Sequence, residues 1–258
     1  MKNRVLITSV GRKVGLVKAF QEAGWYVLGE DLNPSSIALN FCDEKFEEGK
    51  EVNLWIPTRD AEIKEAWEFN GWDTNYLDIC LDKLKFHNFC KSNRFKTPEV
   101  YWVKPRIGAG NREGEILWQE FIGAEEISVD GYRDLRGNVI SVIPRKRLKV
   151  ISGESCVTST IESSLIISQS VLMANLLHLV GHFVMQCFLV ENIPVWLECN
   201  ARLGGGSIVG IRAGCQSPSW MLKEINGKHI TPCIGNYKVG LTGKSYTEWS
   251  FDEDGNNS

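Results

Sequence analysis

The sequence lacks a strong charge excess, and it lacks closely spaced cysteine pairs. Its 258 residues carry 29 Lys and Arg against 32 Asp and Glu, a formal charge of −3. This balance argues against a broad cationic field that would draw the protein to nucleic acid or anionic lipid. The eight cysteines form no C-x-x-C pair, and several lie in apolar runs where Cys acts as a small hydrophobe. This pattern fits a reducing cytosol.

Long apolar segments are also missing. The most apolar region, residues 165–190, is interrupted by Ser, Gln, Asn and His, and the apolar stretch near the N-terminus is too short for a signal peptide. We therefore expect a soluble, cytoplasmic protein with neither nucleic acid nor a membrane as partner.

Familiar catalytic patterns are absent as well. The four histidines are dispersed, and no Ser-His-Asp or Cys-His arrangement can be argued for. His182 lies in an apolar stretch, which favours a core residue over a catalyst. The dinucleotide fingerprint G-x-G-x-x-G is missing, because only Gly11 and Gly15 follow the first apolar run. A structural turn is therefore favoured there over NAD binding.

The first part of the chain has an α/β pattern. Residues 4–10 form a β-branched apolar run, residues 14–23 repeat apolar side chains at helical spacing, and residues 25–29 read as a second strand. Strand, helix and strand in this order predict a parallel βαβ unit at the start of a doubly wound sheet. Such a sheet binds ligands at the carboxyl ends of its strands.

The pattern changes near residues 95–100. A helix is predicted over residues 82–93 and stops before Pro98, and short β-rich runs separated by Gly, Asn and Asp then indicate an antiparallel sheet. A long helical pattern follows over residues 163–181, and strands are predicted at 183–190 and 195–198. The C-terminal part is therefore α+β in character, with a domain boundary near this change.

Oxygen-bearing side chains gather on the two predicted strands of residues 183–207. Glu198 and Asn200 are two residues apart and share one face of a strand, and a hairpin turn can bring Gln186 beside them. Carboxylate and amide oxygens are what Mg²⁺ selects. Arg202, two residues further along, lies on the same face and can pair with a phosphate. The three glycines that follow allow backbone N–H groups to approach an anion. The alternative is a solvated strand edge that leads into a glycine turn.

The segment LECNARLGGGS resembles the E-x-N-P-R-x-G-G-G element of ATP-grasp enzymes, in particular the carbamoyl-phosphate-synthase-like branch. The resemblance implies that Glu198 and Asn200 bind the metals and that Arg202 contacts phosphate. Gln186 stands where the family has a further acidic or amide residue near the metals. Ala201 replaces the usual proline, which loosens the backbone but removes no ligand.

Two upstream elements resemble the phosphate-binding parts of the same family. The run VKPRIGAG is similar to V-K-P-R-x-G-S-G, which implies that Lys104 contacts the nucleotide and that Gly108 and Gly110 lie in a loop over the phosphates. The Asp82-Lys83 pair resembles the family's D-K pair, which implies a second phosphate-binding cation at Lys83. Taken alone, Lys104 is equally well an ordinary surface residue, and for Lys83 an ordinary exposed helix lysine is the favoured interpretation.

The run QEFIGAEEISVD resembles the family's adenine hinge. The resemblance implies that Glu120, Phe121 and Ile122 contact the base and that Glu126 accepts the ribose hydroxyls. Asp130 at the end of the run is expected to be structural.

Three consecutive cations follow on the next predicted strand. Side chains alternate along a strand, so Arg145 and Arg147 are expected to share one face and Lys146 to lie on the other. In the resembling enzymes this strand runs beside the γ-phosphate, where cations stabilise the transition state of phosphoryl transfer.

The resemblance implies an ATP-grasp fold with a Rossmann-like domain at residues 1–97, a shortened lid at 98–130 and a metal-binding part at 131–258. It also implies a carboxylate–amine ligase that uses ATP and Mg²⁺, with Mn²⁺ as an alternative metal, through an acyl phosphate. Its partners would be small-molecule carboxylates and amines, and a homodimer is left open. The lid is expected to be shortened because typical ATP-grasp chains have more than the fourteen residues that lie here between Pro105 and Glu120. The rival hypothesis is a non-catalytic ATP-binding regulatory or scaffold protein.

Residues that choose the carboxylate are harder to identify. Arg12, Asp31 and Arg59 follow predicted strands of the first part and are candidates for this role. Each is equally well an ordinary surface charge.

Overall fold

The computed structural model describes residues 2–105, 115–151 and 154–244. The first part is a parallel sheet of order β3-β2-β1-β4, which confirms the predicted βαβ unit. Its strands are β1 (Arg4–Thr8), β2 (Tyr26–Glu30), β3 (Glu44–Lys45) and β4 (Leu54–Ile56). Helix α1 (Val14–Glu22) connects β1 to β2, and the 3-10 helix η1 (Ile37–Phe41) follows β2.

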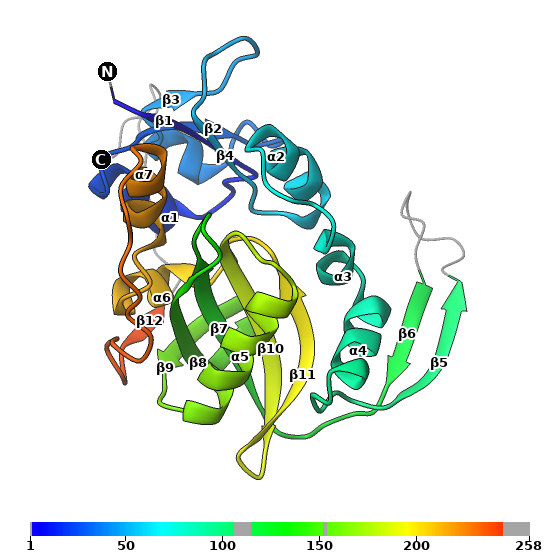
Figure 1. The fold of residues 1–258 in the computed structure, drawn as a ribbon. Coiled ribbons are helices and arrows are strands. Elements are labelled where there is room, and N and C mark those ends of the chain that lie inside the picture. The colour runs from blue at the N-terminus through cyan, green and yellow to red at the C-terminus, as the bar shows by residue number, and fades with distance from the viewer. Residues whose placement is uncertain (1, 106–114, 152–153, 245–258) are drawn as a thin grey trace.

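Short helices lead from this sheet to the rest of the chain (Figure 1). They are η2 (Asp60–Glu62), α2 (Ile63–Phe69), α3 (Leu77–Leu81) and α4 (Lys83–Ser92). Helix α4 begins where the sequence predicts because the Asp82 carboxylate accepts hydrogen bonds from the N–H groups of Leu84 and Lys85, at 2.8 and 2.9 Å.

Beyond α4 lies an antiparallel hairpin of β5 (Val100–Pro105) and β6 (Glu115–Gln119), at the edge of the molecule (Figure 1). The chain then enters β7 (Glu125–Arg133), which is a strand of the large sheet. The lid boundary expected at residue 130 therefore falls inside β7.

The large sheet is antiparallel and has the order β11-β10-β7-β8-β9-β12. The remaining strands are β8 (Val139–Ile151), β9 (Glu154–Thr160), β10 (Gly181–Val190), β11 (Ile193–Asn200) and β12 (Thr242–Lys244). Helices α5 (Ser164–Leu176), α6 (Ser207–Ala213) and α7 (Ser217–Ile225) complete the fold. Glu191 and Asn192 join β10 to β11 with φ of +48° and +64°, a two-residue turn that matches the twist of a hairpin.

The two faces of the large sheet differ in polarity. On one face, side chains such as Ile127, Val129 and Met185 are buried in a core with α5 and α4. On the other face, Ser128 lies opposite both Arg145 and Gln186. Side chains alternate along each strand, so burying the apolar face against α5 and α4 turns the polar face toward the first sheet.

The first sheet and helices α6 and α7 share one hydrophobic core. This core contains Phe20 and Trp25 from the first part together with Ile211, Trp220 and Met221 from the last. The Trp25 indole N–H donates to the Pro218 carbonyl over 2.8 Å. This shared core holds the carboxyl ends of the first sheet against the polar face of the large sheet.

The cysteines behave as apolar residues. All eight are free thiols, and burial raises the pKa of both Cys90 and Cys187 to about 12. Across the described residues, no helix combines the length and apolarity needed to cross a bilayer.

Candidate active site

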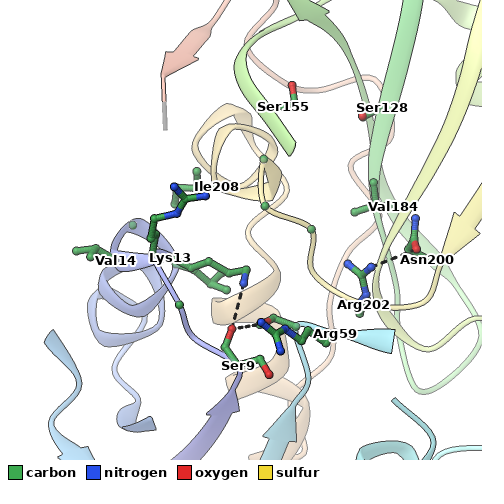
Figure 2. A pocket seen from close by; sticks show the side chains of 18 of the residues that line it. Ser9, Lys13, Val14, Arg59, Ser128, Ser155, Val184, Asn200, Arg202 and Ile208 are labelled. Atoms are coloured by element: carbon green, nitrogen blue, oxygen red, sulfur yellow. Dashed lines mark hydrogen bonds between the residues drawn. The ribbon is translucent and has the colours of Figure 1, made fainter. Parts of the chain in front are cut away.

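A cavity of about 980 Å³ lies between the two sheets. Its first-domain side is made by the loops at the carboxyl ends of β1, β2 and β4, and its opposite side by the polar face of the large sheet. The glycines between β11 and α6 close a third side. Figure 2 shows Ser9, Lys13 and Arg59 on the first side, with Asn200 and Arg202 near them and Ser128 and Ser155 farther along.

The three predicted metal ligands converge in this cavity. Gln186 on β10 pairs in register with Glu198 on β11, and Asn200 follows on the same face. The Asn200 amide donates to Glu198 Oε1 over 3.0 Å. The hairpin therefore brings together the residues that the sequence placed on neighbouring strands.

These oxygens already face positive charge. Lys83 Nζ lies 2.9 Å from Glu198 Oε2, an Arg147 nitrogen donates to Gln186 Oε1 over 2.9 Å, and Arg202 donates to Asn200 Oδ1 over 3.4 Å. One carboxylate and two amide oxygens form a hard donor set that suits Mg²⁺. The side chain of Lys83 is 62% exposed, so it can leave Glu198 without a packing cost.

The set is small for a metal bound by protein alone. Within the described parts of the chain, no three His, Cys, Asp or Glu side chains are grouped to hold a metal ion. Mg²⁺ usually keeps other oxygen ligands, including phosphate oxygens, beside one or two carboxylates. The residues present therefore fit a metal that arrives with a nucleotide.

Glu198 is charged at neutral pH. Burial acts to raise its pKa, but the charge and hydrogen bond of Lys83 and the hydrogen bond of Asn200 outweigh burial, so that the pKa lies below its ordinary value. An anionic carboxylate facing a cavity is the state that a metal ligand requires.

Arg202 connects the first domain to the three predicted metal ligands, which we call the metal end of the cavity. Its Nε lies 2.6 Å from Asp60 Oδ1 in η2, and another of its nitrogens contacts Asn200. Its predicted position on the side of Glu198 and Asn200 is confirmed, whereas no sequence signal pointed to Asp60, which lies 142 residues away.

Arg147 lines the cavity beside Gln186, and it also forms an ion pair with Glu126 on β7. The predicted alternation is confirmed, because Arg145 and Arg147 both line the cavity while Lys146 points away and bonds Glu125 at 2.9 Å. Glu126 was expected to accept ribose hydroxyls, and in this structure its carboxylate holds Arg147.

Arg145 is the centre of a buried polar network. Its side chain is only 2% exposed, and its Nε lies 2.6 Å from the carboxylate of Asp130, which is fully buried. Ser207 donates to Asp130 over 2.5 Å, and His182 Nε2 lies 3.2 Å from the same carboxylate. Burial acts to raise the pKa of Asp130, but Arg145 and His182 outweigh it and hold the pKa well below its ordinary value.

This network fixes the glycine run. The Ser207 hydroxyl also accepts the N–H of Gly204 over 2.9 Å, so Asp130 positions the start of α6 through one hydroxyl. A Cβ built on Gly206 would lie 2.7 Å from an Arg145 nitrogen. Gly206 was expected to admit an anion to the backbone, and the structure adds that it makes room for Arg145. Asp130 is structural, as expected, and His182 is a buried residue with polar partners.

Gly210 on α6 leads to a testable expectation. A Cβ there would lie 2.6–2.7 Å from three atoms of Asp130, whose side chain is held by hydrogen bonds. We expect Gly210→Ala to lower the free energy of unfolding by about 1–3 kcal/mol, because overpacking outweighs the ~1 kcal/mol gain in helix propensity. Chemical denaturation measures this.

The matched control is Gly204→Ala, whose Cβ would meet Val184 at an ordinary 3.4 Å. We expect it to change the stability by less than about 0.5 kcal/mol. Equal losses for the two variants would contradict the packing argument.

Ser155 on β9 is a cavity residue that the sequence did not reveal. Ser155 is 8% exposed and lines the cavity, and its buried Oγ has no hydrogen-bond partner among the described residues. A buried hydroxyl without a partner costs stability unless a ligand or water satisfies it. Ser155, which is labelled in Figure 2, is therefore a candidate contact for a polar ligand atom in this cavity.

The three first-domain candidates, Arg12, Asp31 and Arg59, all line the cavity. The sequence did not single out Ser9 and Lys13, which line it beside them. Ser9 has φ of +54°, which is uncommon for a residue with a side chain, and its carbonyl accepts a hydrogen bond from Lys13 Nζ over 3.1 Å.

The predicted hinge lines a second cavity of about 670 Å³. Glu120, Phe121 and Ile122 lie on its wall opposite Lys91 and Arg94 of the α4 segment. Phe121 is 92% exposed, so its ring is available for contact.

Other predicted contacts cannot be placed. Gly108 and Gly110 lie outside the described residues, and Lys104 is described only by its backbone in β5.

Several solved structures have a similar fold. The chain matches N5-carboxyaminoimidazole synthetase from Staphylococcus aureus, solved with ADP, with a TM-score of 0.70 and 14% identity over 93% of this chain and 81% of that one. It matches phosphoribosylglycinamide synthetase from Anaerococcus prevotii with a TM-score of 0.65 and 15% identity, over 88% and 76% of the two chains.

The biotin carboxylase domain of the Hydrogenobacter thermophilus 2-oxoglutarate carboxylase, solved with MgADP, ADP and bicarbonate, is also similar. Its TM-score is 0.69 at 14% identity, over 94% of this chain and 73% of that one. At these identities the likeness shows the fold. No curated protein matches the chain in sequence.

A family model identifies the chain more directly. The model described as "ATP-grasp in the biosynthetic pathway with Ter operon" matches residues 112–241, about half of the chain. It spans strands β7 to β11 of the large sheet, the predicted metal ligands and the glycine run. The resemblance predicted from the motifs is confirmed, and the chain belongs to the ATP-grasp family of enzymes.

Proposed function

We propose that this protein is an ATP-dependent carboxylate–amine ligase that works through an acyl phosphate. One observation carries the proposal: Gln186, Glu198 and Asn200 meet Arg145, Arg147 and Arg202 in a single cavity. Oxygen ligands beside arginines are what phosphoryl transfer requires, because catalysis there consists of positioning and charge stabilisation.

The adenine is proposed to lie in the second cavity, against Phe121 and Ile122, and the phosphates to lie over the polar face toward Glu198. Mg²⁺ held by Gln186, Glu198 and Asn200 would neutralise the phosphate oxygens. Lys83 would leave Glu198 for the phosphates, consistent with its predicted role.

The arginines have separate tasks. Arg202 is placed to orient the substrate carboxylate for attack on the γ-phosphorus, since it stands between the metal end and the first domain. Arg147 faces the phosphates, whereas Arg145 is held below the glycine run and contributes a fixed charge. The acyl phosphate forms as the carboxylate oxygen attacks and ADP leaves, and an amine then displaces phosphate. No protein nucleophile is needed.

Nucleotide binding provides the first test. A ligand bound only by the native state adds RT ln(1 + [L]/Kd), about 2.7 kcal/mol at a hundredfold excess over Kd. We expect thermal melts to show this stabilisation with ADP and Mg²⁺ together. The shift should be smaller with ADP alone. The site has one carboxylate, so the metal and the nucleotide phosphates are expected to bind together, each completing the contacts of the other. The absence of any shift at millimolar Mg-ADP would refute the proposal.

The non-catalytic alternative makes the same binding prediction but differs in turnover. Release of ADP and phosphate in a mixed pool of carboxylates and amines separates the two. Binding of Mg-ADP without turnover of any pool would favour the regulatory or scaffold protein.

A further inference from the structure

Three cysteines gather behind the metal end, on the core side of the large sheet. Cys199 lies between Glu198 and Asn200 on β11, and it is part of the core that packs on the apolar face. Side chains alternate along a strand, so Cys199 points away from the cavity that its two neighbours line. Cys90 on α4 is part of the same core, and Cys80 on α3 packs against it. A thiol therefore lies directly behind the two proposed ligands of β11.

Cys80 and Cys199 are in direct contact. A side-chain hydrogen bond joins the two thiols. Helices α3 and α4 lie beside β11 and pack against it (Figure 1). The same segment contacts β11 a second time, through the ion pair of Lys83 with Glu198 at 2.9 Å. The α3–α4 segment thus touches β11 on the core side through the thiols and on the cavity side through the ion pair.

The thiols differ in their access to solvent. Cys199 and Cys90 are fully buried, whereas Cys80 is partly exposed. A partly exposed thiol in contact with a second thiol is the usual arrangement of a redox-sensitive cysteine, because the exposed sulfur meets the oxidant and its neighbour resolves the product. Cys80 is the one of these three that an oxidant can reach.

We propose that Cys80 and Cys199 form a reversible disulfide under oxidation by hydrogen peroxide, and that this disulfide weakens the metal end. The peroxide oxidises the Cys80 thiol to a sulfenic acid and is itself reduced to water. The Cys199 thiol then attacks the Cys80 sulfur. The S–S bond forms as the sulfenic hydroxyl leaves with the Cys199 proton as a second water. A dithiol reductant restores both thiols.

The effect on binding follows from the length of the new bond. A disulfide bond is about 2 Å long, much shorter than the separation of two hydrogen-bonded sulfur atoms, so its formation draws β11 and α3 together at Cys199. Glu198 and Asn200 are the residues on either side, and they shift with the Cys199 backbone. Metal ligands must lie within about 0.2 Å of their ideal distances. This step rests on the proposed function, because it takes Glu198 and Asn200 as metal ligands.

The cross-link is tested by mass spectrometry of the full chain. Reduced protein is treated with hydrogen peroxide, the remaining thiols are alkylated, and the digest is compared with and without dithiothreitol. We expect a peptide pair that contains Cys80 and Cys199, lighter by two hydrogen atoms than the sum of its parts and separated by the reductant. The absence of this pair, or a cross-link of Cys199 to Cys90 in its place, would overturn the inference.

The effect on the metal end is tested by calorimetric titration with Mg-ADP. We expect the Kd of the oxidised protein to be about tenfold or more above that of the reduced protein, and dithiothreitol to restore it. Cys80→Ser should bind Mg-ADP like the reduced wild type both before and after peroxide. Cys42→Ser is the matched control, because Cys42 is also partly exposed but its thiol donates to the Ala38 carbonyl over 3.3 Å. This variant should keep both the cross-link and the change in Kd.

Thermal melts check that both variants fold, and the reduced and oxidised wild-type samples carry the test if Cys80→Ser does not. An unchanged Kd in the cross-linked protein, or loss of binding by peroxide-treated Cys80→Ser, would overturn the effect on the metal end. Failure of the reduced wild type to bind Mg-ADP would instead refute the proposed function, while the mass of the digest still decides the cross-link.

Discussion

Replacing Asp130 by alanine is expected to lower the free energy of unfolding by about 3–5 kcal/mol, because the change leaves a buried guanidinium without a counter-charge. Arg145 is 2% exposed and bonds Asp130 at 2.6 Å. Urea denaturation measures the loss. Arg145→Met in the same background should recover part of it, because that change removes the uncompensated charge.

The chain contains a control of equal geometry. Arg202 bonds Asp60 through the same Nε atom at the same 2.6 Å, but the Asp60 side chain is 55% exposed. Asp60→Ala is expected to cost less than about 1 kcal/mol, because solvent screens the pair. Similar losses for the two variants would show that burial does not decide the contribution of these pairs.

Acid should act on the same pair. The pKa of Asp130 lies below its ordinary value in the folded protein. A carboxyl of this kind adds stability that is complete above its unfolded pKa, about 3.9, and is lost as the pH falls below that value. Between neutral pH and pH ~3, the free energy of unfolding should therefore fall by fewer kcal/mol in the Asp130→Ala variant than in the wild type.

Glu198→Gln is expected to reduce phosphate release by at least about 10²-fold while the fold is kept. The change preserves side-chain volume and removes the one carboxylate among the three proposed metal ligands. The measurement is phosphate release with the carboxylate and amine pair found in the substrate pool, together with the thermal melt of the variant.

The matched control is Glu191→Gln, in the exposed turn of the same β10–β11 hairpin. The change removes the same charge from the same hairpin, but away from the three proposed metal ligands. Turnover should stay within about twofold of the wild type, because substitutions of exposed residues of this kind are near neutral. Near-full turnover by Glu198→Gln would show that the metal end is misplaced.

Much of the site could be predicted because it follows from local periodicity. Residues two apart on a strand share a face, so Glu198, Asn200 and Arg202 are linked by sequence alone. The turn at Glu191 and Asn192 then brings Gln186 into register with Glu198. The βαβ start and the cap at Asp82 are equally local and are confirmed.

Other features could not be predicted because they depend on packing between distant segments. No sequence pattern pairs Asp60 with Arg202 or places Ser155 in the cavity. A Cβ at Gly206 would collide with Arg145 and one at Gly210 with Asp130, but this is visible only when α6 lies on the large sheet.

The sequence by itself determined the family and the strand faces, and it singled out the residues proposed to bind metal and phosphate, because alternation and short motifs act within a few residues. Only the tertiary structure decided which ion pairs the charged side chains of the site form within the protein. Burying apolar surface brings the first sheet and α6 and α7 into one core, and this burial places Arg12, Lys13 and Arg59 across the cavity from the metal end. The sequence leaves Arg12 and Arg59 either as site candidates or as surface charges and does not single out Lys13, whereas the packing of the core places all three in the wall of the cavity.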